Sequence, residues 1–155
     1  MRSTQVSEFS PWLHRFFVAT VGLLALTGFA QMPIFKRYYI ADLPGLGWLS
    51  QYFLTHYLHY LGAVILLAIM AYAVADLLLT QAGHHRATVS GWVQAAFLAG
   101  LVATGVPRVI KNYEGYYLSE GWIVFLDIFH LAMAMGFLTC GTFRLLAGKQ
   151  WTTRR

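Results

Sequence analysis

The sequence predicts an all-α integral membrane protein, a four-helix up-down-up-down bundle. Of its 155 residues, 58% are hydrophobic and only 11% are charged, whereas soluble chains average roughly 45–50% apolar and about 25% charged residues. The apolar residues form four long runs, and a helix needs about 20 of them to cross a bilayer. Four such runs use up the chain, so residues 1–155 are interpreted as a single transmembrane domain without a second, soluble domain.

The four runs cover about residues 11–32, 52–80, 90–106 and 121–147. Pro11 suits the first turn of a helix. A cleaved signal peptide is the alternative for the first run, but the run is long for one. Pro107 is expected to end the third run, and Gly148 follows the fourth. No internal repeat is apparent between the runs.

The connections differ in character. Residues 31–51 are rich in proline, glycine and aromatic residues, and such an irregular loop does not lie in hydrocarbon. We expect this loop to fold back over the helix ends as an interfacial cap. Residues 81–89 predict a short hairpin, and residues 108–120 predict a second polar connection.

Lysine and arginine predict the orientation, because cytoplasmic loops carry more of them. With both termini inside, seven lie on the inner side and four on the outer side. The inner residues are Arg2, Arg15, Arg86, Arg144, Lys149, Arg154 and Arg155, and the outer ones are Lys36, Arg37, Arg108 and Lys111. The net charge of +5 is therefore attributed to topology and not to nucleic acid. Without a mitochondrial-type presequence, the plasma (inner) membrane of a bacterium or archaeon is expected.

Histidines are the candidate functional residues, because ionisable groups inside spans are costly and usually functional. His59 lies about six residues into the second run and His130 about nine into the fourth, which is roughly 10 and 13 Å from the same side. One haem b could therefore lie between them with an imidazole on each face. His56 is the alternative ligand, or a propionate partner, and His14 lies near the opposite side.

Other residue types limit the chemistry. Cys140 is the only cysteine, which excludes an internal disulfide and any CxxC or CxxCH site. Glycines on all four runs would leave room for a porphyrin, although small residues also serve close helix packing.

Three short motifs resemble the four-helix cytochrome b subunits of respiratory formate dehydrogenases (the gamma subunit) and nickel–iron hydrogenases. They are "LHRFFVATVGLLALTGFAQMP", which contains His14 and Thr27-Gly28, "HYLHYLGAVILL" and "DIFHLAMAMGF". The resemblance implies an outer haem held by His59 (or His56) and His130. It implies an inner haem held by His14 and a histidine 14 residues after His130, where this chain has Arg144.

That departure favours one haem over two, unless His14 takes His84 or His85 as its partner. Arg144 is a candidate for binding a quinone oxygen or a haem propionate, or for pairing with Asp76; it is equally open to snorkelling to the inner interface. Asp127 either orients an imidazole from outside the ligand set or pairs with Arg108 or Lys111 at the surface.

The expected function is electron transfer between the quinone pool and a partner subunit. The partner would carry iron–sulfur, molybdenum, nickel–iron or multihaem centres, so the chain would be a subunit in membrane lipid and not a stand-alone enzyme. Two alternatives remain from other classes. One is a non-haem membrane anchor of such a complex, and the other is a small proton-conducting or transport subunit.

Overall fold

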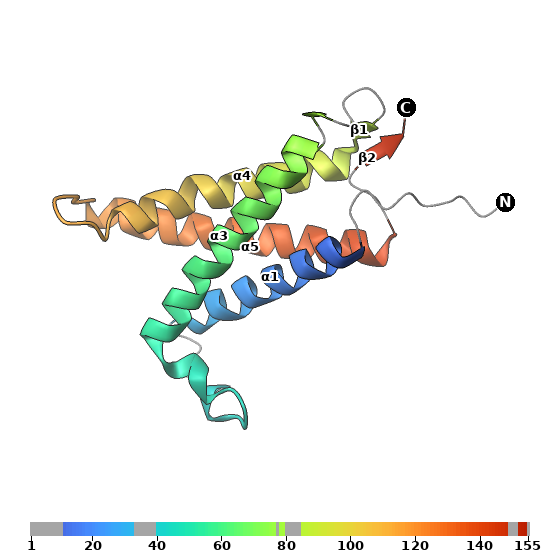
Figure 1. Ribbon diagram of the computed structural model, residues 1–155. Helices are drawn as coiled ribbons and strands as arrows, with labels where there is room; N and C mark the ends of the chain where they lie inside the picture. Colours follow the sequence, from blue (N-terminus) through green and yellow to red (C-terminus); the bar gives the residue numbers. More distant parts are fainter. Residues whose placement is uncertain (1–10, 33–39, 77, 80–84, 149–151, 155) are drawn as a thin grey trace. The chain divides into compact units, whose positions relative to one another are not determined.

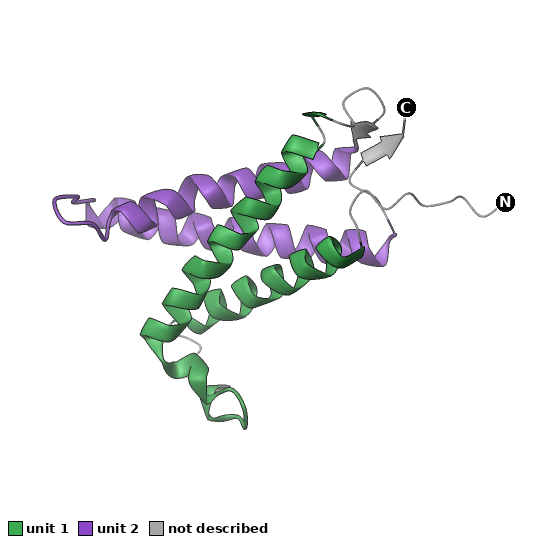
Figure 2. Ribbon diagram, viewed as in Figure 1, with its two compact units in different colours: residues 1–79 green, residues 80–155 purple. Residues whose placement is uncertain are grey.

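Four helices dominate the computed structural model, which describes residues 11–32, 40–76, 78–79, 85–148 and 152–154 (Figure 1). They are α1 (Pro11–Ala30), α3 (Tyr52–Asp76), α4 (Val89–Ile110) and α5 (Glu120–Leu146). All four are long and apolar enough to cross a membrane. The chain divides into two compact units, residues 1–79 (unit 1) and residues 80–155 (unit 2), coloured separately in Figure 2.

Unit 1 is an antiparallel helical hairpin of α1 and α3. The backbone of Gly62 in α3 lies against the side chain of Leu24 in α1, which sets how closely the two helices approach. The connection contains two short 3-10 helices, η1 (Ile40–Asp42) and η2 (Gly47–Ser50). Leu49 and Ala41 form a small core there against Ala30 at the end of α1. The described part of the loop therefore folds back onto the helix end, as expected.

Unit 2 is a second antiparallel hairpin, made of α4 and α5. Thr88 caps the start of α4, because its hydroxyl accepts a hydrogen bond from the backbone N–H of Gly91 at 3.0 Å. Two short strands also belong to unit 2, β1 (His85–Ala87) and β2 (Thr152–Arg154). They pair antiparallel with His85 opposite Arg154, an element that the apolar pattern did not predict.

The prediction that Pro107 ends the third span was wrong. Helix α4 continues through Pro107 to Ile110, and the carbonyl of Pro107 accepts a hydrogen bond from the N–H of Lys111 at 2.9 Å. Proline removes one N–H from the ladder, a loss that helices of this apolar class tolerate. The extra turn has a consequence for the site, because it places Arg108 on helix α4 and not in the connection.

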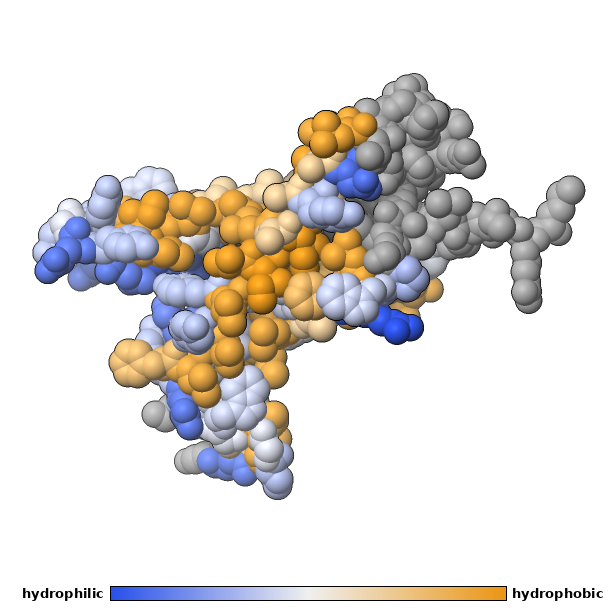
Figure 3. Space-filling model, in the orientation of Figure 1, coloured by the Kyte–Doolittle hydropathy of each residue, from blue (hydrophilic) through white to orange (hydrophobic). Residues whose placement is uncertain are grey.

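The helices leave most of their apolar side chains exposed. Only 11% to 17% of the apolar stretch of each helix is buried, and large side chains such as Phe53 and Leu146 are more than four-fifths exposed. Figure 3 shows the hydrophobic residues spread over the visible face. A helix that is apolar on all sides is typical of a membrane span or a large core, and the described residues do not enclose these helices in such a core.

Candidate functional site

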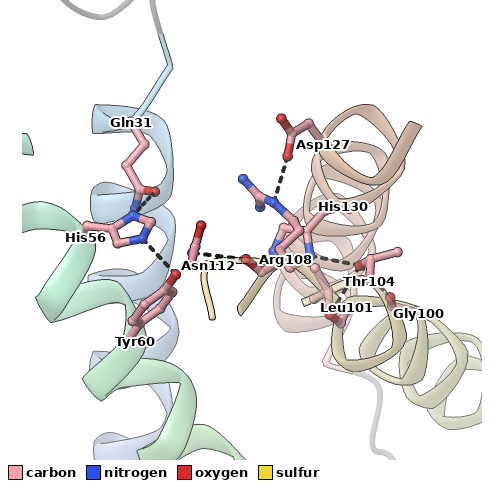
Figure 4. A network of polar contacts seen from close by, with 10 residues as sticks. All are labelled: Gln31, His56, Tyr60, Gly100, Leu101, Thr104, Arg108, Asn112, Asp127 and His130. Carbon is pink, nitrogen blue, oxygen red and sulfur yellow. Dashed lines mark hydrogen bonds and ion pairs between the residues drawn. The ribbon is translucent and has the colours of Figure 1, made fainter. Parts of the chain in front are cut away.

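In unit 2, the imidazole of His130 is held by a buried threonine. Oγ1 of Thr104 in α4 lies 2.8 Å from Nδ1 of His130 in α5 (Figure 4). The same hydroxyl donates its only hydrogen to the carbonyl of Gly100 at 2.7 Å. Oγ1 therefore accepts from Nδ1–H of His130. This arrangement selects the tautomer in which Nε2 carries the lone pair.

Unit 1 contains the same arrangement. Oγ1 of Thr27 in α1 lies 3.0 Å from Nδ1 of His59 in α3, and its hydroxyl donates to the carbonyl of Leu23 at 2.7 Å. Thr27 is completely buried, so water does not compete for the contact. By the same reasoning, the proton of the His59 ring lies on Nδ1 and the lone pair lies on Nε2.

A glycine follows each of these threonines and lies close to the same imidazole. A Cβ atom at Gly28 would be 3.3 Å from Cε1 of His59, and a Cβ atom at Gly105 would be 3.5 Å from Cε1 of His130. The Thr-Gly pair thus offers a hydroxyl to Nδ1 and open space to the neighbouring ring carbon. Both features bring the imidazole close to the opposite helix.

A polar pair lies one turn beyond each histidine. In unit 1, Nδ1 of His56 is 3.0 Å from Oε1 of Gln31, and its Nε2 is 2.7 Å from the hydroxyl of Tyr60 (Figure 4). Both nitrogens of His56 are therefore engaged. In unit 2, Nε of Arg108 lies 2.8 Å from Oδ1 of Asp127. The distance makes this an ion pair, but the N–H of Nε does not point at the carboxylate oxygen well enough for a hydrogen bond.

The structure distributes the predicted site residues between the two units. His14, His56, His59 and Asp76 belong to unit 1, and Asp127, His130 and Arg144 belong to unit 2. His14 is exposed on α1, Asp76 is the last residue of α3, and Arg144 is buried near the end of α5. Of the two interpretations of Asp127, the structure shows the ion pair with Arg108. His84 lies outside the described residues, and His85 begins β1.

Sequence reasoning missed the threonines. It gave Asp127 as the candidate acceptor beside an imidazole, whereas the oxygen on Nδ1 of His130 is that of Thr104. The signal that identifies them is the dipeptide Thr-Gly, which occurs at 27–28 and again at 104–105. Among the described residues, no group of three or more His, Cys, Asp or Glu side chains is placed to hold a bare metal ion.

Comparisons with protein-family profiles, with curated protein sequences and with solved structures found no match. The fold and the site therefore define the class by themselves. The chain is a helical protein with four helices that are long and apolar enough to cross a membrane. Each of its two helical hairpins presents one imidazole held by a threonine.

Proposed function

We propose that this chain is a membrane electron-transfer subunit that holds one haem b through His59 and His130. The observation that supports the proposal is the pair of buried Thr–His contacts. Each fixes Nδ1 of an imidazole on a protein oxygen and leaves Nε2 as the basic nitrogen. A histidine from each of two helices, ligating through such a nitrogen, is a common way for helical proteins to hold haem iron.

The residues fit the cofactor in their local geometry. A metal-bound histidine almost always donates its other ring N–H to a protein oxygen, which fixes the tautomer and the ring orientation. Thr27 and Thr104 supply that oxygen from inside the protein. His59 shares with His130 the contact between Nδ1 and a buried threonine hydroxyl, whereas His56 contacts Gln31 and Tyr60. The proposal therefore takes His59 as the ligand from unit 1.

The chain would supply the setting for electron transfer and the cofactor would supply the redox couple. A bound haem b contributes a one-electron iron couple whose potential depends on its ligands and surroundings. His59 and His130 would fix the ligation, Thr27 and Thr104 would raise the basicity of the imidazoles, and the apolar helices would exclude water. Because the sequence has a single cysteine, other redox centres would belong to partner subunits.

The finer topology belongs to the same proposal. Two successive antiparallel hairpins support an up-down-up-down bundle. The excess of lysine and arginine on one side supports both termini on the cytoplasmic side. The membrane would be a bacterial or archaeal plasma membrane. The electron partners would be a quinone and a redox subunit of a respiratory oxidoreductase. Arg144, with Asp76 and His14 as further candidates, is proposed for the quinone at the inner side.

The test is a reduced-minus-oxidised spectrum with haem quantification on the purified protein. The wild type should show a b-type spectrum with about one haem per chain, as expected for a single pair of imidazole ligands. His59→Ala and His130→Ala should each lose this spectrum. His56→Ala should keep the spectrum, even at lower occupancy, since the ligand set is intact.

Three outcomes would contradict parts of the proposal. A folded but colourless wild type would favour the non-haem anchor. Loss of the spectrum in His56→Ala, together with its retention in His59→Ala, would show that His56 and not His59 is the haem ligand. Loss of half of the haem in His14→Ala would reveal a second haem at the inner side.

A further inference from the structure

The two helical hairpins carry polar residues at the same spacings around an identical threonine and histidine. In each hairpin, a polar residue follows the threonine of the first helix by four positions. These are Gln31, directly after the end of α1, and Arg108 in α4. In each second helix, a polar residue precedes the histidine by three positions. These are His56 before His59 in α3, and Asp127 before His130 in α5.

The contacts match as well as the spacings. Thr27 contacts His59 as Thr104 contacts His130, with O···N distances of 3.0 and 2.8 Å. One turn further along, Gln31 contacts His56 at 3.0 Å as Arg108 contacts Asp127 at 2.8 Å. Residues four apart on one helix and three apart on the other lie on the same faces. Each hairpin therefore has two successive polar layers in the same register.

The next layer shows that helix packing alone does not impose this likeness. In unit 1 the small residue is on the second helix, where Gly62 receives Leu24. In unit 2 it is on the first helix, where Gly100 receives Met133. The small residue of the apolar layer thus lies on different helices in the two units. The first-helix positions also differ by one, because Leu24 precedes Thr27 by three residues and Gly100 precedes Thr104 by four. The likeness is specific to the histidine and to the layer beyond it.

We infer that the two hairpins are two copies of one half-site. In each copy a polar pair, Gln31–His56 or Arg108–Asp127, acts as the equivalent positioning pair that fixes where the imidazole of His59 or His130 lies along its helix pair. The inference rests on the proposed function for the identity of the ligand. A ligand that binds to two equivalent half-sites has two equivalent faces, and each face binds one imidazole nitrogen. A planar metal macrocycle has this property. The contacts thus repeat between the hairpins, although no repeat is apparent in the sequence.

The inference is tested by exchanging the pairs. Gln31→Arg combined with His56→Asp gives unit 1 the polar pair of unit 2, and Tyr60→Leu completes the exchange because Leu131 occupies the equivalent position. This triple variant should bind haem with an affinity near that of the wild type. Gln31→Arg alone places a guanidinium beside His56, and its haem affinity should fall about tenfold or more, the usual loss when a contact that orients a ligand is broken.

The spectroscopic readout separates positioning from folding. In the folded fraction of Gln31→Arg, the midpoint potential and the electron paramagnetic resonance of the haem should shift, and the triple variant should restore both. A pair that only stabilises the fold would change the yield of protein and leave those values unchanged. The reverse exchange, Arg108→Gln with Asp127→His, provides the same comparison in unit 2 if the first set fails to fold.

The inference and the proposed function fail in different ways. If the triple variant binds haem no better than Gln31→Arg, and the reverse exchange gives no rescue either, the halves are not equivalent. If the wild type binds no haem, the proposed function fails, but the exchange is still measured by thermal unfolding in detergent. Rescue of the melting temperature in the exchanged variants would then support the equivalent pairs, and absence of rescue would overturn them.

Discussion

Thr104 in α4 and His130 in α5 are joined by a contact of 2.8 Å between Oγ1 and Nδ1, inside a helix pair where Thr104 is only 5% exposed. The hydroxyl of Thr104 donates its hydrogen to the carbonyl of Gly100. Its oxygen is therefore committed to accepting. Because Nδ1 must be the donor in this short, buried contact, the contact fixes both the ring orientation and the tautomer of His130.

Removal of this hydroxyl should weaken haem binding. Thr104→Val keeps the shape of the side chain and leaves Nδ1–H of His130 without its acceptor. Haem affinity should fall about 10- to 100-fold, and the hairpin should lose about 1–3 kcal/mol, the cost of an unsatisfied buried donor. Haem titration and thermal unfolding in detergent measure the two effects.

Thr55→Val is the matched control. Thr55 is completely buried, and among the described residues its hydroxyl donates to the carbonyls of Gln51 and Tyr52 in its own chain segment. This variant should leave haem affinity unchanged. Equal losses in the two variants would show that Thr104 acts through general packing and not through His130.

The glycine beside His59 should resist enlargement. A Cβ atom in Gly28→Ala would lie 3.3 Å from Cε1 of His59, so the ring would have to move by a few tenths of an ångström. We expect a shifted haem spectrum and lower affinity. Gly22→Ala, where nothing lies within 4 Å, should be neutral or stabilising, since alanine favours the helix. A normal spectrum in Gly28→Ala would show that the ring has room.

Two glycines of unit 2 should differ in their tolerance of alanine. In Gly136→Ala the added methyl group would overlap the rigid ring of Phe97, whereas in Gly100→Ala it would meet the end of the flexible Met133 side chain. Gly136→Ala should therefore lose about 1–3 kcal/mol by overpacking, and Gly100→Ala should lose less. Thermal unfolding of the two variants in the same detergent gives the comparison, and the opposite order would contradict it.

The proposed quinone role of Arg144 has its own test. The side chain is 7% exposed near the end of α5, where an arginine can bind an oxygen of a ligand. Arg144→Leu should keep the haem spectrum but abolish reduction of the haem by a quinol, followed by stopped-flow absorbance. Arg144→Lys should retain part of the rate. Unchanged quinol kinetics in Arg144→Leu would remove the quinone from this position.

Much of the fold could be predicted because each apolar helix depends mainly on the residues of its own segment. A run of apolar residues near 20 long is sufficient to predict a membrane-crossing helix, and the four predicted runs agree with α1, α3, α4 and α5 to within a few residues. The main error was at Pro107. There the local rule for proline was outweighed by the continuation of α4, which brings Arg108 opposite Asp127.

The candidate site was predicted in part. His59 and His130 were chosen by depth, which depends only on position along each helix. Their partners depend on the register between two helices, and register is set by packing at residues such as Gly62 and Leu24. The contact between His56 and Gln31 has the same origin, because Gln31 lies at the end of the other helix, whereas Tyr60 is four residues further along α3.

By itself, the sequence determined four apolar helices, their order and the positions of His59 and His130 along two of them, because hydropathy and helical rise act along one chain segment at a time. Only the tertiary structure decided that Thr27 meets His59 and Thr104 meets His130, and that the two hairpins repeat one set of contacts. Such contacts join residues 32 and 26 positions apart. They exist only once side-chain packing has fixed how the two helices of each hairpin are aligned.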